Sequence, residues 1–468
     1  MASTDTNDIY WRAYFKAIKL QAGGGATEPG MGKEYFYIAS NANRSIAASR
    51  FIPMATTNEY LYQEADNLMD PNAPLYVPGA GNTSYVQALY TYLRHVKRPR
   101  DTLTPEEEKA EKALTQKLKD AQATYRSERK SAMADWKEEK DFENLSFGAW
   151  AFKNARTFYA AWEALNTADG ALQDFLASVY GADAQKYRSD MKKISGVAND
   201  ILAPVPGLSM TCSNIPVLDV AEGIEKAKKG DRGPPVGEPV GYERPAYSLD
   251  PQYRDTMDRW AVEYDSTPST GNAKVTWEQG SKTSWKEFGF ENIEAGGGVT
   301  LFGFLRIGGH GGSHTEYENV KIDEKNSTVD IELKWKKLQF FNVYPGTWNI
   351  PQIRETYPEV VDLDEAQKLL IRPTQFLCAS GLSITCKLGG QAKEEADRLY
   401  KKQVEAGGSA GVRWGLFGFD AGGGYKKEDG TQTSTSSYDT QKGELTISPT
   451  PTFGNCTLLG VRGQAVSI

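Results

Sequence analysis

The feature that most constrains this chain is an internal repeat of glycine and aromatic residues in its C-terminal part. A Glu-Ala-Gly-Gly motif begins at Glu294 and again at Glu405, and a Leu-Phe-Gly-Phe motif begins at Leu301 and again at Leu416. In both places a glycine cluster and a polar stretch follow the second motif. Two motifs that recur in the same order predict a duplication, because such self-similarity marks repeated structural units.

The two copies are assigned to residues 283–345 and 393–460, and each is expected to build β-hairpins. Within the first copy, apolar and charged residues alternate over 329–336, which predicts a strand with one buried face. In the second copy, the Asp-Gly pair at Asp429 is a strong turn signal. The sequence therefore predicts a β-rich domain over 273–468 that contains a tandem pseudo-repeat.

Five large aromatic rings accompany the glycine clusters and are the interface candidates. Glycine has no side chain that covers a neighbouring ring, so the rings must be buried by the protein's own sheet, by another copy of the chain, or by lipid. A soluble protein rarely leaves a contiguous apolar patch of more than a few hundred Å² exposed. The five residues are Phe302, Phe304, Trp414, Phe417 and Phe419.

The region over 101–203 carries the clearest helical pattern. Thr104 and Pro105 are typical of a helix start, and Glu107 stands where its side chain completes a capping box. Apolar residues then recur every three or four positions on an otherwise charged surface. This stripe favours a helical hairpin or bundle over a coiled-coil seam for a partner, because too few heptads persist. The stripe consists of Ala110, Leu114, Leu118, Ala121 and Tyr125.

Two further regions complete the domain organisation. Residues 1–100 are interpreted as a mixed α/β region. Residues 204–272 are rich in Pro and Gly and are interpreted as a connector, because proline removes backbone donors and resists both helix and central strand. The predicted class is therefore α+β and multi-domain, with a helical hairpin or bundle followed by a duplicated β-rich domain.

Charge and cysteine usage exclude several classes of protein. The 468 residues carry a net charge of −7, so no basic field favours a nucleic-acid partner. The N-terminus shows neither part of a secretory signal, and no apolar run reaches the ~18 residues that a membrane span needs. Four cysteines without Cys-x-x-Cys spacing argue against a zinc knuckle or a disulfide framework. We therefore expect a cytoplasmic protein.

Motifs for cofactor, metal or nucleophile chemistry are weak. The glycine-rich loop over 25–34 lacks the Gly and Ser/Thr positions that a phosphate-binding loop requires. His310 and His314 lie close in sequence, but two imidazoles on a glycine loop without a third ligand hold a metal poorly. The chain has three histidines and no Gly-x-Ser-x-Gly elbow. We predict no cofactor and no metal, and we assign no catalytic residue.

Two classes of function remain. The first is a non-enzymatic binding or assembly protein whose paired Gly/aromatic hairpins contact a partner chain or a membrane, with a homo-oligomer and a pore-former as versions of it. Against membrane insertion, residues 431–437 offer no apolar alternate face. The second is a cofactor-independent enzyme acting on a small hydrophobic substrate in an aromatic-lined, carboxylate-containing pocket. The rings considered for that pocket are Phe147, Trp150, Phe152, Phe158, Tyr159 and Trp162.

The absence of recognisable catalytic motifs and the visible repeat favour the first class. Rings at helical spacing usually belong to a core, but carboxylates that meet only in space keep the enzyme open as the alternative. A pocket with buried, converging acids would favour the enzyme. A closed core with exposed apolar hairpins would favour the binding protein.

The predicted helix start has a direct test. Replacing Thr104 with Ala removes the side-chain oxygen that accepts a hydrogen bond from the first helical turn, so we expect Thr104→Ala to cost about 1 kcal/mol. The thermal midpoint of unfolding measures this loss. An unchanged midpoint would place the start of the helix elsewhere.

Overall fold

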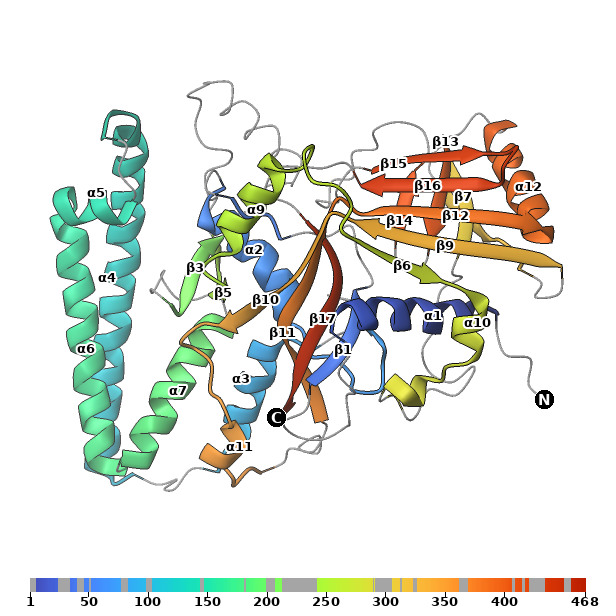
Figure 1. Ribbon diagram of the computed structural model, residues 1–468. Helices are drawn as coiled ribbons and strands as arrows, with labels where there is room; N and C mark the ends of the chain where they lie inside the picture. Colours follow the sequence, from blue (N-terminus) through green and yellow to red (C-terminus); the bar gives the residue numbers. More distant parts are fainter. Residues whose placement is uncertain are drawn as a thin grey trace. The chain divides into compact units, whose positions relative to one another are not determined.

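The computed structural model divides the chain into two compact units. One unit comprises Met1–Tyr92, Ile194–Pro358 and Leu363–Ile468, and the other comprises Leu93–Lys193 and Glu359–Asp362. Helices and strands both contribute extensively (Figure 1), so the predicted α+β class is confirmed. The structure describes residues 6–23, 34–39, 46–49, 52–76, 83–97, 103–143, 147–180, 182–198, 207–212, 242–288, 290, 305–311, 314–322, 326–361, 369–405, 409–414, 417–420, 434–449 and 456–468.

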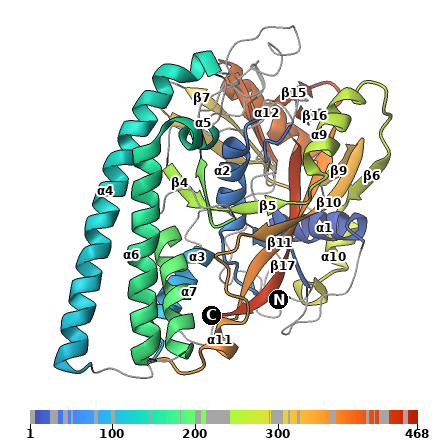
Figure 2. The same cartoon turned by 90° about the vertical axis from the view of Figure 1, so that its left-hand side faces the viewer.

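The smaller unit is built on two long helices that pack along each other (Figures 1 and 2). These are α4 (Pro105–Glu143) and α6 (Arg156–Tyr180), with the short α5 (Phe147–Asn154) between them in the chain. α7 (Ala182–Ala198) follows. The helical pattern predicted over 101–203 is therefore confirmed for the residues of these four helices.

The predicted capping box at the start of α4 is present. The backbone N–H of Glu107 donates to Oγ1 of Thr104 at 3.3 Å, and the backbone N–H of Thr104 donates to Oε2 of Glu107 at 2.7 Å. Two of the donors that a helix start leaves without intrahelical partners are thereby satisfied.

Strands of the larger unit form sheets of six, five, four and two strands among the described residues. The six-stranded sheet has the order β2-β1-β17-β11-β10-β5, and the five-stranded sheet has the order β15-β16-β12-β9-β6. In chain order the strands of the six-stranded sheet are β1 (Glu34–Ala39), β2 (Leu75–Tyr76), β5 (Tyr247–Leu249), β10 (Lys337–Pro345), β11 (Leu369–Ser380) and β17 (Thr457–Ser467). Those of the five-stranded sheet are β6 (Gly271–Val275), β9 (Ser327–Trp335), β12 (Ser383–Gly390), β15 (Ser434–Asp439) and β16 (Glu444–Pro449).

The alternation over 329–336 is confirmed as a half-buried strand. Along β9, the apolar residues are buried and the charged residues between them are exposed or half-buried. This period of two gives the strand one face toward the core.

The two smaller sheets have the orders β14-β13-β7-β8 and β3-β4. The four-stranded sheet contains β7 (Leu305–Gly311), β8 (His314–Asn319), β13 (Ser409–Trp414) and β14 (Phe417–Asp420). The pair consists of β3 (Ser209–Cys212) and β4 (Tyr242–Pro245). Helical elements outside the smaller unit's helices are α1 (Thr6–Gln21), α2 (Met54–Ala65), α3 (Tyr85–His95), α9 (Tyr253–Val262), α10 (Trp277–Ser281), the 3-10 helix η1 (Trp285–Phe288), α11 (Ile353–Thr356) and α12 (Gln391–Glu405).

The six- and five-stranded sheets share strands that pass from one into the other. β9 ends at Trp335 and β10 begins at Lys337, while β11 ends at Ser380 and β12 begins at Ser383. β9 pairs with β12 and β10 pairs with β11, both antiparallel. β9 and β10 together form one long composite strand, and β11 and β12 form a second. Each composite strand changes direction between the two sheets (Figure 1).

The change of direction is centred on Gly381 and Lys336. Gly381 has φ of 64°, and a Cβ added there would lie 2.6 Å from Cγ of Lys336. The backbone N–H of Lys336 donates to the carbonyl of Ser380 at 2.9 Å, which joins the two composite strands at the bend. The ammonium of Lys336 lies 4.0 Å from the ring centre of Tyr264. The charge of Lys336 therefore faces an aromatic ring, and its aliphatic chain lies beside Gly381.

None of the helices within the described ranges is both long enough and apolar enough to cross a bilayer.

The bend gives a prediction about stability. The left-handed conformation of Gly381 costs other L-residues roughly 1–2 kcal/mol, so we expect Gly381→Ala to lower the free energy of unfolding by about that amount in urea denaturation.

Gly170 provides a control of opposite sign, because it lies inside α6 and a Cβ added there meets nothing within 4 Å. Gly170→Ala should stabilise the helix by roughly 0.5–1 kcal/mol. Equal effects of the two substitutions would show that the bend imposes no backbone constraint.

Candidate assembly site

Two long insertions leave the five-stranded sheet at the same end. The first, residues 276–326, lies between β6 and β9, and the second, residues 391–433, lies between β12 and β15. The registers Gly390↔Ser327 and Lys387↔Glu444 bring the end of β12 beside the start of β9 and of β16, and β6 runs antiparallel to β9 toward the same edge. Both copies of the predicted repeat therefore begin from one side of a single sheet.

The two insertions join in one sheet. β7 of the first pairs antiparallel with β13 of the second, from Trp414↔Leu305 to Ser409↔His310. β8 and β14 flank this central pair. Backbone hydrogen bonds thus connect segments that are far apart in the sequence.

The structure describes three of the five interface candidates, and only by their backbone. Phe302 and Phe304 lie outside the described residues. Trp414 ends β13, opposite both Leu305 and Phe417, and Phe419 lies opposite Val412, which in turn lies opposite Ile307. Directly opposite residues of an antiparallel sheet belong to one cross-strand row on one face.

These rows contain buried positions. Leu305 and Ile307 each expose 2% of their surface. α12 packs against both β7 and β13, and its buried residues recur at Ala392, Ala396 and Leu399 on one helical face. The face of the four-stranded sheet that carries the rows of Leu305 and Ile307 is therefore the covered one.

Exposed charges also connect the two insertions. Glu318 of β8 pairs with Lys402 of α12 and lies 3.9 Å from Arg398 of the same helix. Side chains at this exposure contribute little to stability. The joined backbone, not these ion pairs, holds the insertions together.

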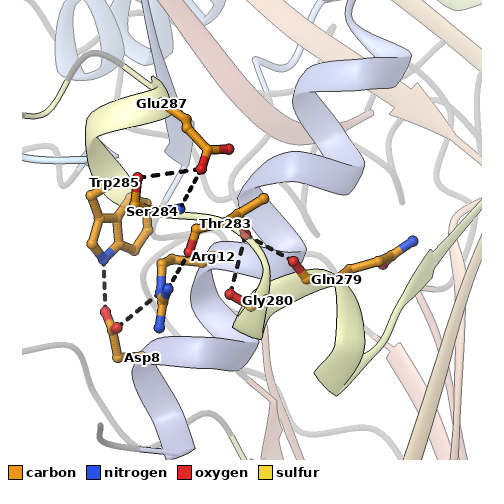
Figure 3. A network of polar contacts seen from close by, with 8 residues as sticks. All are labelled: Asp8, Arg12, Gln279, Gly280, Thr283, Ser284, Trp285 and Glu287. Carbon is orange, nitrogen blue, oxygen red and sulfur yellow. Dashed lines mark hydrogen bonds and ion pairs between the residues drawn. The ribbon is translucent and has the colours of Figure 1, made fainter.

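A polar network fastens the beginning of the first insertion to α1 (Figure 3). Nε of Arg12 lies 2.9 Å from Oδ2 of Asp8, one helical turn earlier, and these side chains are only 11% and 12% exposed. Nη1 of Arg12 donates to the carbonyl of Thr283. Nε1 of Trp285 donates to Oδ1 of Asp8 at 2.7 Å. The pair on α1 thus bonds to the insertion through both of its charged groups.

The rest of the network in Figure 3 is local to the insertion. Oγ1 of Thr283 donates to the carbonyls of Gln279 and Gly280 at 2.9 and 3.2 Å. Glu287 accepts from the backbone N–H of Ser284 at 3.2 Å. These bonds shape the turn between α10 and η1, and they place Thr283 and Trp285 against α1.

Aromatic packing surrounds this network. The ring of Phe15 on α1 lies 4.7 Å from that of Phe288 and 5.6 Å from those of Trp285 and Phe290. Tyr10 contacts Trp277 at 5.9 Å. Such edge-on and tilted contacts are favourable beyond the apolar area that they bury.

Asp66 is a buried carboxyl, and its surroundings are those of a helix cap. Asp66 accepts from the hydroxyl of Tyr247 at 2.9 Å, from the backbone N–H of Val86 at 3.1 Å and from the hydroxyl of Ser84. Burial raises the pKa of Asp66, although these hydrogen bonds act in the opposite direction. The donors at the start of α3 occupy the carboxyl oxygens, which is a structural use.

The cysteine nearest to a polar group is equally unsuited to nucleophilic chemistry. Nδ2 of Asn58 lies 3.1 Å from Sγ of Cys212. Burial raises the pKa of the Cys212 thiol to about 12. The thiol is therefore protonated at neutral pH, and only a thiolate is a strong nucleophile.

The aromatic residues considered for a pocket in the helical region contact one another. Phe158 lies 5.4 Å from Tyr125 and 5.7 Å from Phe147 between ring centres. Trp150 is buried against Ala132 and Ala151, with Nε1 donating to Glu139. Trp162 is 46% exposed. Phe147, Trp150, Phe158 and Tyr159 thus belong to one packed cluster, and the side chain of Phe152 lies outside the described residues.

The histidines at 310 and 314 lie at the tip of the β7–β8 hairpin, where Gly311 pairs with His314. In the part of the chain that the structure describes, no three His, Cys, Asp or Glu side chains come together as a metal site.

Comparisons with known proteins give no relative: no family model matches the chain, and neither a curated protein nor a solved structure shows significant similarity to it.

The sequence did not single out Asp8 and Arg12, which bond to the beginning of the first insertion. Asp8 and Arg12 are spaced as an i, i+4 ion pair on a helix, which is the one signal that the sequence offers for them. Nothing in the sequence indicates that the pair faces Thr283 and Trp285, because 271 and 277 positions separate the bonded residues.

The structural role of Asp66 gives a pH-dependent prediction. The folded-state pKa of Asp66 is raised, so the folded protein binds the proton before the unfolded chain does as the pH falls. Its contribution to stability is therefore present below the unfolded pKa and is lost as the pH rises through the folded pKa.

Asp66→Asn removes this pH-dependent contribution to stability. It also places amide N–H groups opposite hydrogen-bond donors, which should cost about 1–3 kcal/mol at neutral pH. We expect the difference in unfolding free energy between wild type and variant to widen as the pH is lowered toward about 4. A difference that narrows instead would contradict a raised pKa.

Proposed function

We propose that this protein is a non-enzymatic binding or assembly protein. Its paired Gly/aromatic insertions, residues 276–326 and 391–433, contact a second copy of the chain, a partner protein or a membrane, in the manner of a soluble pore-former. The observation that carries the proposal is the pairing of β7 with β13, which unites both insertions in one sheet at one end of a larger sheet.

The placement of the glycine-rich strands supports this proposal. Glycine in a strand allows another backbone or a ring to approach closely, and β7 contains Gly308, Gly309 and Gly311. A sheet that only stabilised its own fold would gain more from β-branched residues. Glycine at these positions weakens the sheet by itself and suits one that rearranges or receives a partner.

Three of the ring-bearing residues, Trp414, Phe417 and Phe419, belong to the strands that join the two insertions. Trp414 and Phe417 lie in the row of the buried Leu305. Duplication of residues 283–345 and 393–460 remains part of the proposal, because the two sequence motifs recur in the same order in both insertions.

Light scattering with and without liposomes tests the proposal. We expect wild type to form oligomers or to bind phosphatidylcholine vesicles, and we expect the double variant Phe417→Ser/Phe419→Ser to lose that behaviour while it stays folded. A wild type that remains monomeric and ignores vesicles removes the support. A double variant that unfolds shows that the rings belong to the core.

Tyr344→Ser is the matched control, because Tyr344 is a 47% exposed ring on β10, outside both insertions. It should assemble as wild type does. Loss of assembly in this control as well would assign the effect to general surface hydrophobicity.

A further inference from the structure

We propose that Cys378 and Cys456 form a dithiol that hydrogen peroxide oxidises to a disulfide, with Cys456 as the attacking sulfur and Cys378 as the resolving one. Both thiols are free in the reduced protein. Neither belongs to the insertions 276–326 and 391–433, so this modification site is separate from the proposed assembly surface.

The two cysteines lie on neighbouring strands of the six-stranded sheet. Cys378 belongs to β11, and Cys456 directly precedes β17, which pairs with β11. Leu458 lies opposite Cys378, and Cys456 stands two positions before Leu458, which makes the two cysteines diagonal neighbours. The register shifts between Leu377 and Cys378, and such an irregularity changes the direction of a side chain. The two thiols meet there and are hydrogen-bonded to each other.

The hydroxyl of Tyr253 on α9 completes the cluster. It lies 3.3 Å from Sγ of Cys456 and also bonds to Cys378. The same hydroxyl donates to the carbonyl of Ile46 at 3.0 Å. A phenol both donates and accepts, so this hydroxyl accepts from a neutral thiol and can turn its hydrogen toward a thiolate. The cluster therefore has a group that stabilises charge on sulfur.

The surroundings of the two sulfurs assign different roles to them. The hydrogen bond from Cys378 lowers the pKa of Cys456, and the hydroxyl of Tyr253 acts in the same direction against burial. Burial raises the pKa of Cys378. Because the thiolate is the nucleophile, Cys456 is the sulfur that attacks first, and Cys378 keeps its proton for the second step.

One molecule of hydrogen peroxide balances the reaction. The thiolate of Cys456 attacks a peroxide oxygen, so that an S–O bond forms, the O–O bond breaks, and hydroxide leaves and takes up a proton as water. The thiol of Cys378 then attacks the sulfur of this sulfenic acid. The S–S bond forms, the S–O bond breaks, and the hydroxyl leaves with the proton of Cys378 as a second water.

Burial restricts the oxidants that reach this pair. Cys378 and Cys456 expose 1% and 2% of their surfaces. Hydrogen peroxide is small and uncharged, so brief local openings of the fold admit it. A large, charged disulfide reagent needs a much wider opening. We therefore expect the folded protein to react with peroxide and to exclude the larger reagent.

Cys212 and Cys386 provide a comparison within the same chain. Both are fully buried, but the groups that shift their pKa values are not thiols; they include Asn58 for Cys212 and Asp330 for Cys386. A sulfenic acid at either position has no resolving thiol beside it. These two cysteines should therefore form no disulfide in the folded protein.

Peptide mapping of the folded, reduced protein after exposure to hydrogen peroxide tests the proposal. Free thiols are alkylated in denaturant before digestion. We expect a peptide pair joined through Cys378 and Cys456 to form about tenfold or more faster than any oxidation of Cys212 or Cys386. Equal oxidation of all four cysteines, or the absence of the joined pair, would overturn the proposal. Reaction of the folded protein with a charged aromatic disulfide reagent would overturn the selectivity for peroxide.

Two variants test the order of the steps. Cys378→Ser should stop the reaction at a sulfenic acid on Cys456, which dimedone traps, and Cys456→Ser should abolish the fast reaction. A sulfenic acid on Cys378 in Cys456→Ser, with an inert Cys378→Ser, would overturn the assignment of roles. Cys212→Ser is the matched control and should form the disulfide at the wild-type rate. If a variant unfolds, the joined peptide of the wild type decides.

Tyr253→Phe tests the hydroxyl through the pH dependence of the rate. The hydroxyl lowers the pKa of Cys456, so its removal should raise that pKa and move the rise of the oxidation rate to higher pH. A merely structural role would change the rate at every pH alike. A profile that does not move would exclude Tyr253 from the reaction.

The disulfide should also make the protein harder to unfold. The chain between Cys378 and Cys456 contains the whole second insertion, and a bond that closes a long loop restricts the unfolded chain. Oxidised wild type should therefore unfold at a higher urea concentration than reduced wild type, and peroxide-treated Cys378→Ser should show no such increase. An unchanged or lower midpoint in the oxidised wild type would overturn a stabilising effect of the oxidation.

Discussion

Backbone pairing that runs from one sheet into the next is the constraint on which the rest of this structure depends. β9 continues into β10 across Lys336, and β11 continues into β12 across Gly381. Because the two composite strands pair along both sheets, the register of one sheet sets the register of the other. A slip by one residue would turn the buried faces of both sheets outward at once, so this pairing is strongly specified.

The position of both insertions follows from that pairing. The edge of the five-stranded sheet where β12 ends and β9 and β16 begin is also where the insertions start. Their proximity allows β7 and β13 to pair, although neither strand would be stable as an isolated glycine-rich segment. The site is thus a consequence of the larger sheet.

Two sets of buried polar groups in this protein serve contacts between segments. Asp66 accepts hydrogen bonds at the start of α3 and is occupied by them. The pair Asp8–Arg12 joins α1 to a segment that lies 271 positions further along the sequence. Both arrangements satisfy groups that would be costly if they were left unpaired. The two arrangements differ in place. Asp66 lies beside the start of α3, whereas the pair Asp8–Arg12 joins α1 to the first insertion.

Local pattern by itself determined the capping box at Thr104 and Glu107, the helical stripes after it, and the half-buried strand of β9. These features depend on neighbours within a few residues, so period and capping chemistry suffice to predict them. Residues 6–21 fall in the region 1–100, which the sequence predicted only as mixed α/β, because aromatic content does not distinguish a helix from a strand. Only tertiary structure decided that they form α1, that Arg12 reaches Thr283, and that β7 meets β13. Arg12 and Thr283 are distant in sequence, and so are β7 and β13. The periodicity of one segment does not indicate which distant segment it packs against.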